Sequence, residues 1–141
     1  MYETTSKLFH KLRRQDSAAA YLSQDLPAPT CSQALLRLLD QSGKSVSYWI
    51  TAVDISKSYG YQILRGERRP GRDILLRTAL CLGLTLKDTQ RLLAVGCCGA
   101  LYPRIRRDAA IIFALNQHMT LLETEDLLIS LPERSLYAGE F

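Results

Sequence analysis

Apolar residues recur at helical spacing along most of the chain. One set stands at i, i+3, i+4 and i+7, the spacing of one buried helical face, and comprises Val46, Trp49, Ile50 and Val53. Similar apolar runs predict further helices from Thr30 to near Gly43, over residues 72–82 and over residues 86–93. With a short segment at 56–65, the pattern predicts five consecutive short helices and an all-α fold.

Residues that cap helices punctuate this pattern. Thr30 followed by Gln33 matches a capping box. Ser56 can accept a hydrogen bond from the free N–H groups of a first turn, and Gly66 can adopt the left-handed conformation that closes a last turn. Residues 56–65 are therefore predicted to form a separate helix, followed by a basic loop.

Only Asp54 and Ile55 separate this helix from the one before it. So short a connection requires the two helices to cross steeply, as they do in a helix-turn-helix. Aspartate accepts a left-handed turn conformation better than most residues. The sequence thus predicts a helix-turn-helix whose second helix is 56–65.

Several motifs lie within this unit or after it: Ile55-Ser56-Lys57-Ser58-Tyr59, Gly66, Arg68-Arg69-Pro70 and Leu82-Gly83-Leu84-Thr85-Leu86. On these motifs, residues 35–93 resemble a helix-turn-helix domain of the XRE type, related to phage repressors. The resemblance implies a five-helix repressor-like domain that binds specific DNA sequences and regulates transcription.

The chain departs from the family pattern at four places. Trp49-Ile50 replaces the usual leucine-alanine pair, Asp54 the glycine between the helices, Leu64 a glutamate, and Gly60 a buried isoleucine. We expect the large Trp49 to face the absent side chain of Gly60, because such an exchange conserves core volume.

The family register also implies which side chains meet double-stranded DNA. Lys57, Ser58 and Gln62 occupy base-reading positions, and Tyr61 lies beside Gln62. Lysine can donate to guanine, and glutamine can pair with adenine. Phosphate contacts are expected from the start of the preceding helix and from the basic loop, at Lys44, Ser45, Ser47, Arg65, Arg68, Arg69 and Arg72.

Charge is distributed unevenly along the chain. The net charge is +4, and six basic against two acidic residues between Lys57 and Arg77 account for the same excess. A second basic cluster spans 104–107, whereas residues 119–141 hold five acidic side chains against Arg134. The excess of positive charge therefore coincides with the predicted DNA-reading helix.

The bulk composition restricts the class of protein. The 141 residues, 47% hydrophobic and 23% charged, are typical of a globular protein with a core of its own. No apolar run is long enough to cross a bilayer and Met1 to Phe9 do not resemble a secretory signal, so we expect a cytoplasmic protein without a membrane role.

The four cysteines show no metal-ligand spacing and are expected to be buried thiols. Redox sensing by Cys97-Cys98 is the less favoured interpretation.

A repeat follows the predicted DNA-reading unit. Shifting the chain by 35 residues aligns identical residues at eleven positions, from Arg72-Asp73 on Arg107-Asp108 to Leu101-Tyr102 on Leu136-Tyr137. Such periods usually mark a duplicated supersecondary unit whose copies stack. We therefore expect a C-terminal helical pair that repeats the fourth and fifth helices. Its acidic character favours packing, dimerisation or contact with another protein.

Three segments follow from this division. Residues 1–29 should hold two short helices, near 5–12 and 18–22, and a proline-containing linker at 24–29. Residues 30–103 should form the DNA-binding domain and 104–141 the repeat unit.

The sequence bears on two other functional classes. An enzyme is disfavoured, because His10 and His118 lie far apart and no nucleophile has a recognisable base. No cofactor or metal site is expected. The main alternative is a protein-interaction module that derives from a helix-turn-helix, binds its partner with Trp49, Tyr59 and Tyr61, and has lost DNA contact.

Overall fold

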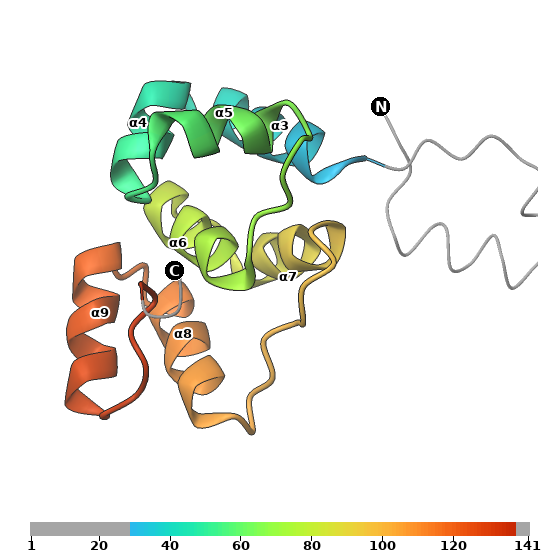
Figure 1. The fold of residues 1–141 in the computed structure, drawn as a ribbon. Helices are drawn as coiled ribbons and strands as arrows, with labels where there is room; N and C mark the ends of the chain where they lie inside the picture. Colours follow the sequence, from blue (N-terminus) through green and yellow to red (C-terminus); the bar gives the residue numbers. More distant parts are fainter. Residues whose placement is uncertain (1–28, 138–141) are drawn as a thin grey trace, which may run out of the picture.

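The computed structural model describes residues 29–137, and this part of the chain is entirely helical (Figure 1). It contains seven helices: α3 (Cys31–Ser42), α4 (Val46–Ala52), α5 (Lys57–Leu64), α6 (Arg72–Leu82), α7 (Leu86–Val95), α8 (Arg106–Asn116) and α9 (Leu121–Ser130). The all-α class is thereby confirmed for the described residues. The helices predicted near 5–12 and 18–22, and the linker up to residue 28, lie outside them.

Local capping explains most helix starts. Thr30 and Gln33 form the predicted capping box, and Ser56 accepts a hydrogen bond from the Tyr59 N–H at 3.1 Å. Thr120 and Glu123 form a second capping box at α9, which holds the pKa of the Glu123 carboxyl below its usual value, mainly through the backbone N–H of Thr120. The helix starts predicted at Thr30 and Ser56 are therefore confirmed.

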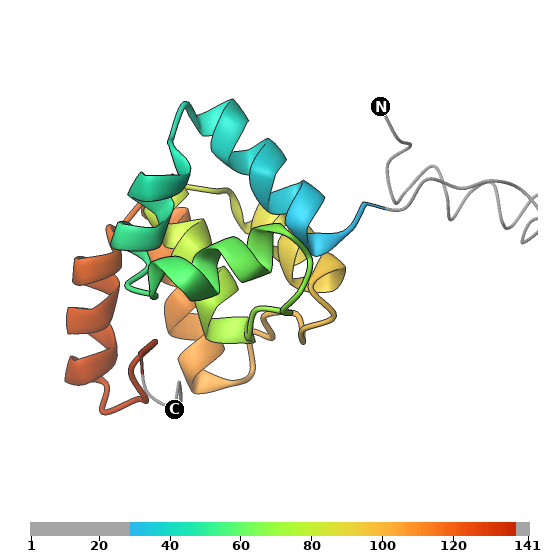
Figure 2. The same cartoon turned by 45° about the horizontal axis from the view of Figure 1, so that its top comes forward.

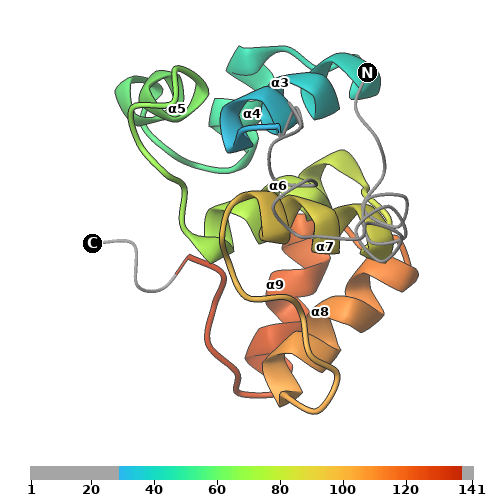
Figure 3. The ribbon, with the colours of Figure 1, turned by 90° about the vertical axis from the view of Figure 1, so that its right-hand side faces the viewer.

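The helices stack in three tiers (Figure 1). α3, α4 and α5 cover one side of α6 and α7, and α8 and α9 lie on the other side. The buried apolar residues form one continuous cluster from Leu35 in α3 to Leu136 after α9. The boundary expected at 103/104 falls in the connection 96–105, which runs from α7 to the start of α8 (Figure 3). The two units on either side of it share one core.

Equivalent hydrogen bonds define the two copies of the repeat. The guanidinium of Arg72 donates to the carbonyl oxygens of Gly99 and Ala100 at 2.8 and 3.0 Å. Arg107 donates to the carbonyl oxygens of Arg134 and Ser135 at 2.9 and 3.2 Å. Each acceptor of Arg107 lies 35 residues after the corresponding acceptor of Arg72, so the two hairpins, α6–α7 and α8–α9, fold their tails in the same way.

Two ion pairs connect the two copies of the repeat, and in each pair the arginine of one copy binds the aspartate of the other. Arg72 binds both oxygens of Asp108 at 3.0 and 2.9 Å, and Arg107 binds both oxygens of Asp73 at 3.1 Å each. Helix contacts are exchanged in the same way, since α6 packs on α9 and α7 packs on α8. The duplicated hairpins therefore face each other across a pseudo-twofold axis.

The ion pairs between the two hairpins keep the buried carboxyl of Asp108 ionised. Burial alone would raise the pKa of this carboxyl. Hydrogen bonds from Arg72 and the Tyr102 N–H, with the positive charges of Arg72 and Arg107, outweigh burial and lower the pKa. Asp108 is therefore a buried carboxylate that stays ionised.

Arg77 ties the upper and lower tiers together. Its side chain is fully buried in α6, and its guanidinium donates to the carbonyl oxygens of Val53 at 2.9 Å and Leu136 at 2.7 Å. The same group lies 4.4 Å from the centre of the Tyr137 ring. One side chain thus connects the end of α4 with the tail of the second hairpin.

Candidate nucleic-acid interface

Two left-handed residues fix both ends of α5. Asp54, in the turn after α4, has φ 58°, and Gly66, just after α5, has φ 78°. Both conformations match the predictions from sequence. Glycine adopts such a conformation without steric cost, whereas aspartate does so with some strain.

The outward side of α5 carries the four predicted base-reading residues. Lys57, Ser58 and Tyr61 are exposed, and Gln62 is half-buried. Gly60 and Ile63 face inward, and Tyr59 packs against the core. α5 lies across the outer side of the molecule, and no other described helix covers it (Figure 2). Because Tyr59 packs against the core, its side chain is not available to bind a protein partner.

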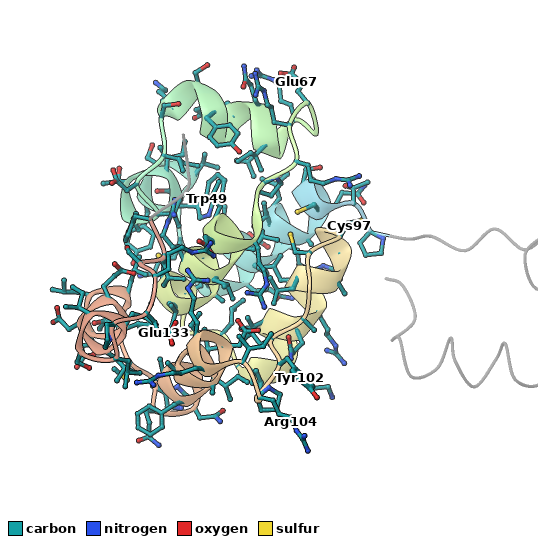
Figure 4. All side chains as sticks on the ribbon, turned by 60° about the horizontal axis from the view of Figure 1, so that its bottom comes forward. Trp49, Glu67, Cys97, Tyr102, Arg104 and Glu133 are labelled. Atoms are coloured by element: carbon teal, nitrogen blue, oxygen red, sulfur yellow. The ribbon has the colours of Figure 1, made fainter. Side chains whose placement is uncertain are left out.

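The inner side of α5 corrects one expectation. A Cβ atom on Gly60 would lie 2.6 Å from Cγ1 and 2.8 Å from Cδ1 of Ile50, so Gly60 accommodates Ile50 rather than Trp49. Trp49 (Figure 4) is fully buried in another direction. Its indole N–H donates to the Thr78 hydroxyl in α6 at 2.9 Å. Helical geometry explains the difference, because adjacent residues point about 100° apart.

The burial of Trp49 also changes the alternative function. A side chain with no exposed surface cannot bind a partner, so Trp49 is removed from the set proposed for a protein-interaction module. Of that set, Tyr61 alone remains exposed.

The first group of expected phosphate contacts is exposed at the start of α4. Lys44, Ser45 and Ser47 all face solvent. The Ser45 hydroxyl accepts a hydrogen bond from the Tyr48 N–H at 3.0 Å, and the Lys44 ammonium lies 4.7 Å from the centre of the Tyr48 ring. The serine therefore caps its own helix and keeps its hydroxyl proton for another acceptor.

The second group lies in the loop after α5. Arg65 binds Glu67 through two hydrogen bonds of 3.0 and 3.2 Å, and these bonds lower the pKa of the exposed Glu67 carboxyl. Arg68 and Arg69 are exposed and make no ion pair with any described residue. These two are the loop cations available to an external anion.

Arg72, unlike Arg68 and Arg69, is not available to an external anion. Its guanidinium is committed to Asp108 and to the carbonyl oxygens of Gly99 and Ala100. Its expected role as a phosphate contact is therefore corrected to a structural one. Of the six cations between residues 57 and 77, Arg72 and Arg77 are used in contacts within the protein, and Arg65 is paired with Glu67. Lys57, Arg68 and Arg69 carry the free charge of this surface.

Sequence reasoning identified Arg72-Asp73 and Arg107-Asp108 as repeated pairs but missed that they bind each other. The signal was present, because a cation and an anion repeated together in stacked copies can be exchanged between them. Arg107 and Asp108 are consequently buried, whereas their neighbours Arg104 and Arg106 are exposed.

Among residues 29–137, no group of three histidine, cysteine, aspartate or glutamate side chains is arranged to hold a metal ion. Within the same residues, no helix has both the length and the apolar character needed to cross a bilayer. Burial raises the pKa of the Cys31, Cys81 and Cys98 thiols, which are half-buried, whereas Cys97 is exposed. Raised pKa values keep these three thiols protonated and weakly nucleophilic.

Comparisons of the chain with protein-family models, with curated proteins and with solved structures gave no match.

Proposed function

We propose that residues 30–103 form a repressor-like helix-turn-helix domain, and that the protein is a cytoplasmic transcriptional regulator which places α5 in the major groove of duplex DNA. One observation carries the proposal. The uncovered side of α5 presents Lys57, Ser58, Tyr61 and Gln62, and exposed hydrogen-bond donors precede it in the chain at the start of α4 and follow it in the next loop.

The dimensions of α5 suit this role. The major groove is about 12 Å wide and admits a helix whose diameter with side chains is about 10–12 Å. The eight residues of α5 are held at both ends, so its side chains reach the groove from a fixed axis. A preorganised helix loses less conformational entropy on binding.

Each outward side chain has chemistry for base edges. Lys57 donates to O6 and N7 of guanine, and Gln62 exchanges two hydrogen bonds with N6 and N7 of adenine. The Ser58 hydroxyl donates or accepts, and the Tyr61 ring meets a thymine methyl group or a phosphate. These four residues are the proposed base contacts.

Phosphate contacts position such a helix on either side of the groove. Lys44, Ser45 and Ser47 supply them from the start of α4, and Arg68 and Arg69 from the loop after α5. Arg65 joins them by exchanging Glu67 for a phosphate. Arg72 is excluded, because its guanidinium is used inside the protein.

The first test is titration of fluorescent random-sequence duplexes at low and at physiological salt. Binding that weakens steeply with salt supports the proposal, because phosphate contacts release counterions. Selection from a random duplex library then identifies the preferred sequence. No binding in dilute buffer would overturn the proposal and favour a protein-interaction module that uses Tyr61.

A further inference from the structure

The contact between the two hairpins has the form of an interface between identical subunits. In an isologous interface, residue i of one copy contacts residue j of the other, and j contacts i in return. Arg72 with Asp108 and Asp73 with Arg107 obey this rule after the shift of 35 residues. Such an arrangement normally requires two chains, but here one chain supplies both halves.

The apolar part of the contact follows the same symmetry. Leu76 and Leu80 in α6 correspond to Ile111 and Leu115 in α8. All four are buried in the shared core, each with no more than 5% of its surface exposed. The face of α6–α7 opposite α3 is therefore filled by the second hairpin.

We propose that the α8–α9 hairpin takes the place of a second subunit, so that the full chain remains monomeric through this face. If the proposed function holds, the protein binds a single DNA half-site without a twofold partner. Of the three roles that the sequence left open for the C-terminal unit, namely packing, dimerisation and contact with another protein, this proposal selects packing.

Differences between the two copies favour the contact within the chain over a contact with a second α6–α7 hairpin. Arg134 stands where the first copy has Gly99, and its guanidinium lies 3.8 Å from Asp73. Arg77 has Ile112 as its counterpart and binds the carbonyl oxygen of Leu136. In a contact with a second α6–α7 hairpin, Gly99 would stand in the place of Arg134 and could supply no cation to Asp73.

The covalent connection adds to this preference. A segment tethered by a short linker has an effective concentration in the millimolar range. Another chain at micromolar concentration competes at a disadvantage of roughly a thousandfold. The connection 96–105 thus keeps the second hairpin on its own first hairpin.

The test begins with sedimentation velocity of the full chain, without DNA, over a wide micromolar range. The expected result is a monomer throughout, whether or not DNA binding is later found. A dimer that is weakened by Arg107→Asp would overturn the proposal, because the exchanged pairs would then lie between chains.

The intramolecular contact is tested by amide hydrogen exchange in α8 and α9. Arg107→Asp should raise exchange rates there at least about tenfold, because it places like charges together in a buried site. Combining it with Asp73→Arg should restore a reversed pair and part of the protection, because an aspartate at position 107 still cannot donate to the carbonyl oxygens of Arg134 and Ser135. Equal exchange in the single and double variants would contradict the exchanged contact.

Arg106→Asp is the matched control, since Arg106 is the neighbouring residue but is exposed and pairs with Glu133 at 3.4 Å. It should leave exchange in α8 and α9 near the wild-type rate. If DNA binding is confirmed, titration of an inverted repeat with half-sites about 10 base pairs apart should show two independent binding events. Cooperative binding of two copies would contradict single-site recognition.

Discussion

Gln62 is the residue whose proposed role in reading DNA bases can be tested most directly. Gln62 is half-buried on the outward side of α5, next to the exposed Tyr61. Gln62→Ala should weaken binding at one adenine-containing base pair by about 1–3 kcal/mol and leave the other positions unchanged. Binding to a panel of single-base-pair variants of the selected site measures this effect.

Gln117→Ala is the matched control, because Gln117 is an exposed glutamine at the end of α8, in the tier on the other side of α6 and α7. It should change neither affinity nor preference. An equal loss across every sequence in the panel for Gln62→Ala would show that Gln62 does not read a base.

Gly60 tests the packing that the structure corrected. An added methyl group at this position meets Ile50 at 2.6 Å, which costs more than the roughly 1 kcal/mol that alanine gains over glycine in a helix. Gly60→Ala should therefore lower the free energy of unfolding by about 1–2 kcal/mol. Denaturant unfolding followed by circular dichroism measures it.

The effect of Gly60→Ala on the free energy of unfolding should change sign when the Ile50 side chain is shortened. In an Ile50→Ala background, Gly60→Ala should stabilise the protein by up to about 1 kcal/mol, because helix propensity then dominates. The same destabilisation in both backgrounds would mean that Ile50 is not the neighbour that limits this site.

At the scale of elements, the loop after α5 should supply salt-dependent affinity. Arg68 and Arg69 are exposed and unpaired among the described residues. Replacing both with alanine should weaken binding to all sequences and reduce the slope of log K against log salt by about 1.8. Titration at four salt concentrations measures the slope.

Arg104→Ala is the control for this pair. Arg104 is also exposed, and Figure 4 shows it at the end of the molecule opposite Glu67, which marks the loop after α5. Its replacement should leave the slope unchanged. Equal effects of the two substitutions would assign the binding to general positive charge rather than to this loop.

At the scale of the whole molecule, Asp108 should link stability to pH. Its pKa is lowered in the folded state, so its contribution to stability is present above the unfolded value of about 3.9 and is lost as the pH falls through the lower folded value. Asp108→Asn should cost about 1–3 kcal/mol at neutral pH. It should also make stability fall less steeply in acid.

Thermal unfolding of both proteins between neutral and strongly acidic pH tests this expectation. Asp88→Asn is the control, because Asp88 forms an exposed pair with Arg91 at 3.6 Å, and such pairs contribute little. Parallel acid profiles for wild type and Asp108→Asn would remove Asp108 as a source of the pH dependence.

The sequence by itself determined the helices and their ends. Hydrophobic spacing and caps such as Ser56 act between residues a few positions apart, so they can be recognised without coordinates. The left-handed Asp54 could be predicted for the same reason. The repeat could be recognised because identical residues recur at a fixed shift of 35 positions, and the outward residues of α5 followed from the family resemblance.

The tertiary structure alone decided which side chains meet across helices. It directed Trp49 to Thr78, placed Ile50 against Gly60, and withdrew Arg72 from the proposed DNA surface into the exchanged pairs. These contacts depend on how helices far apart in the sequence pack, and neither periodicity nor net charge specifies that packing. An exposed arginine and a buried one look the same in a sequence, and they are distinguished only by the acceptors that folding brings to them.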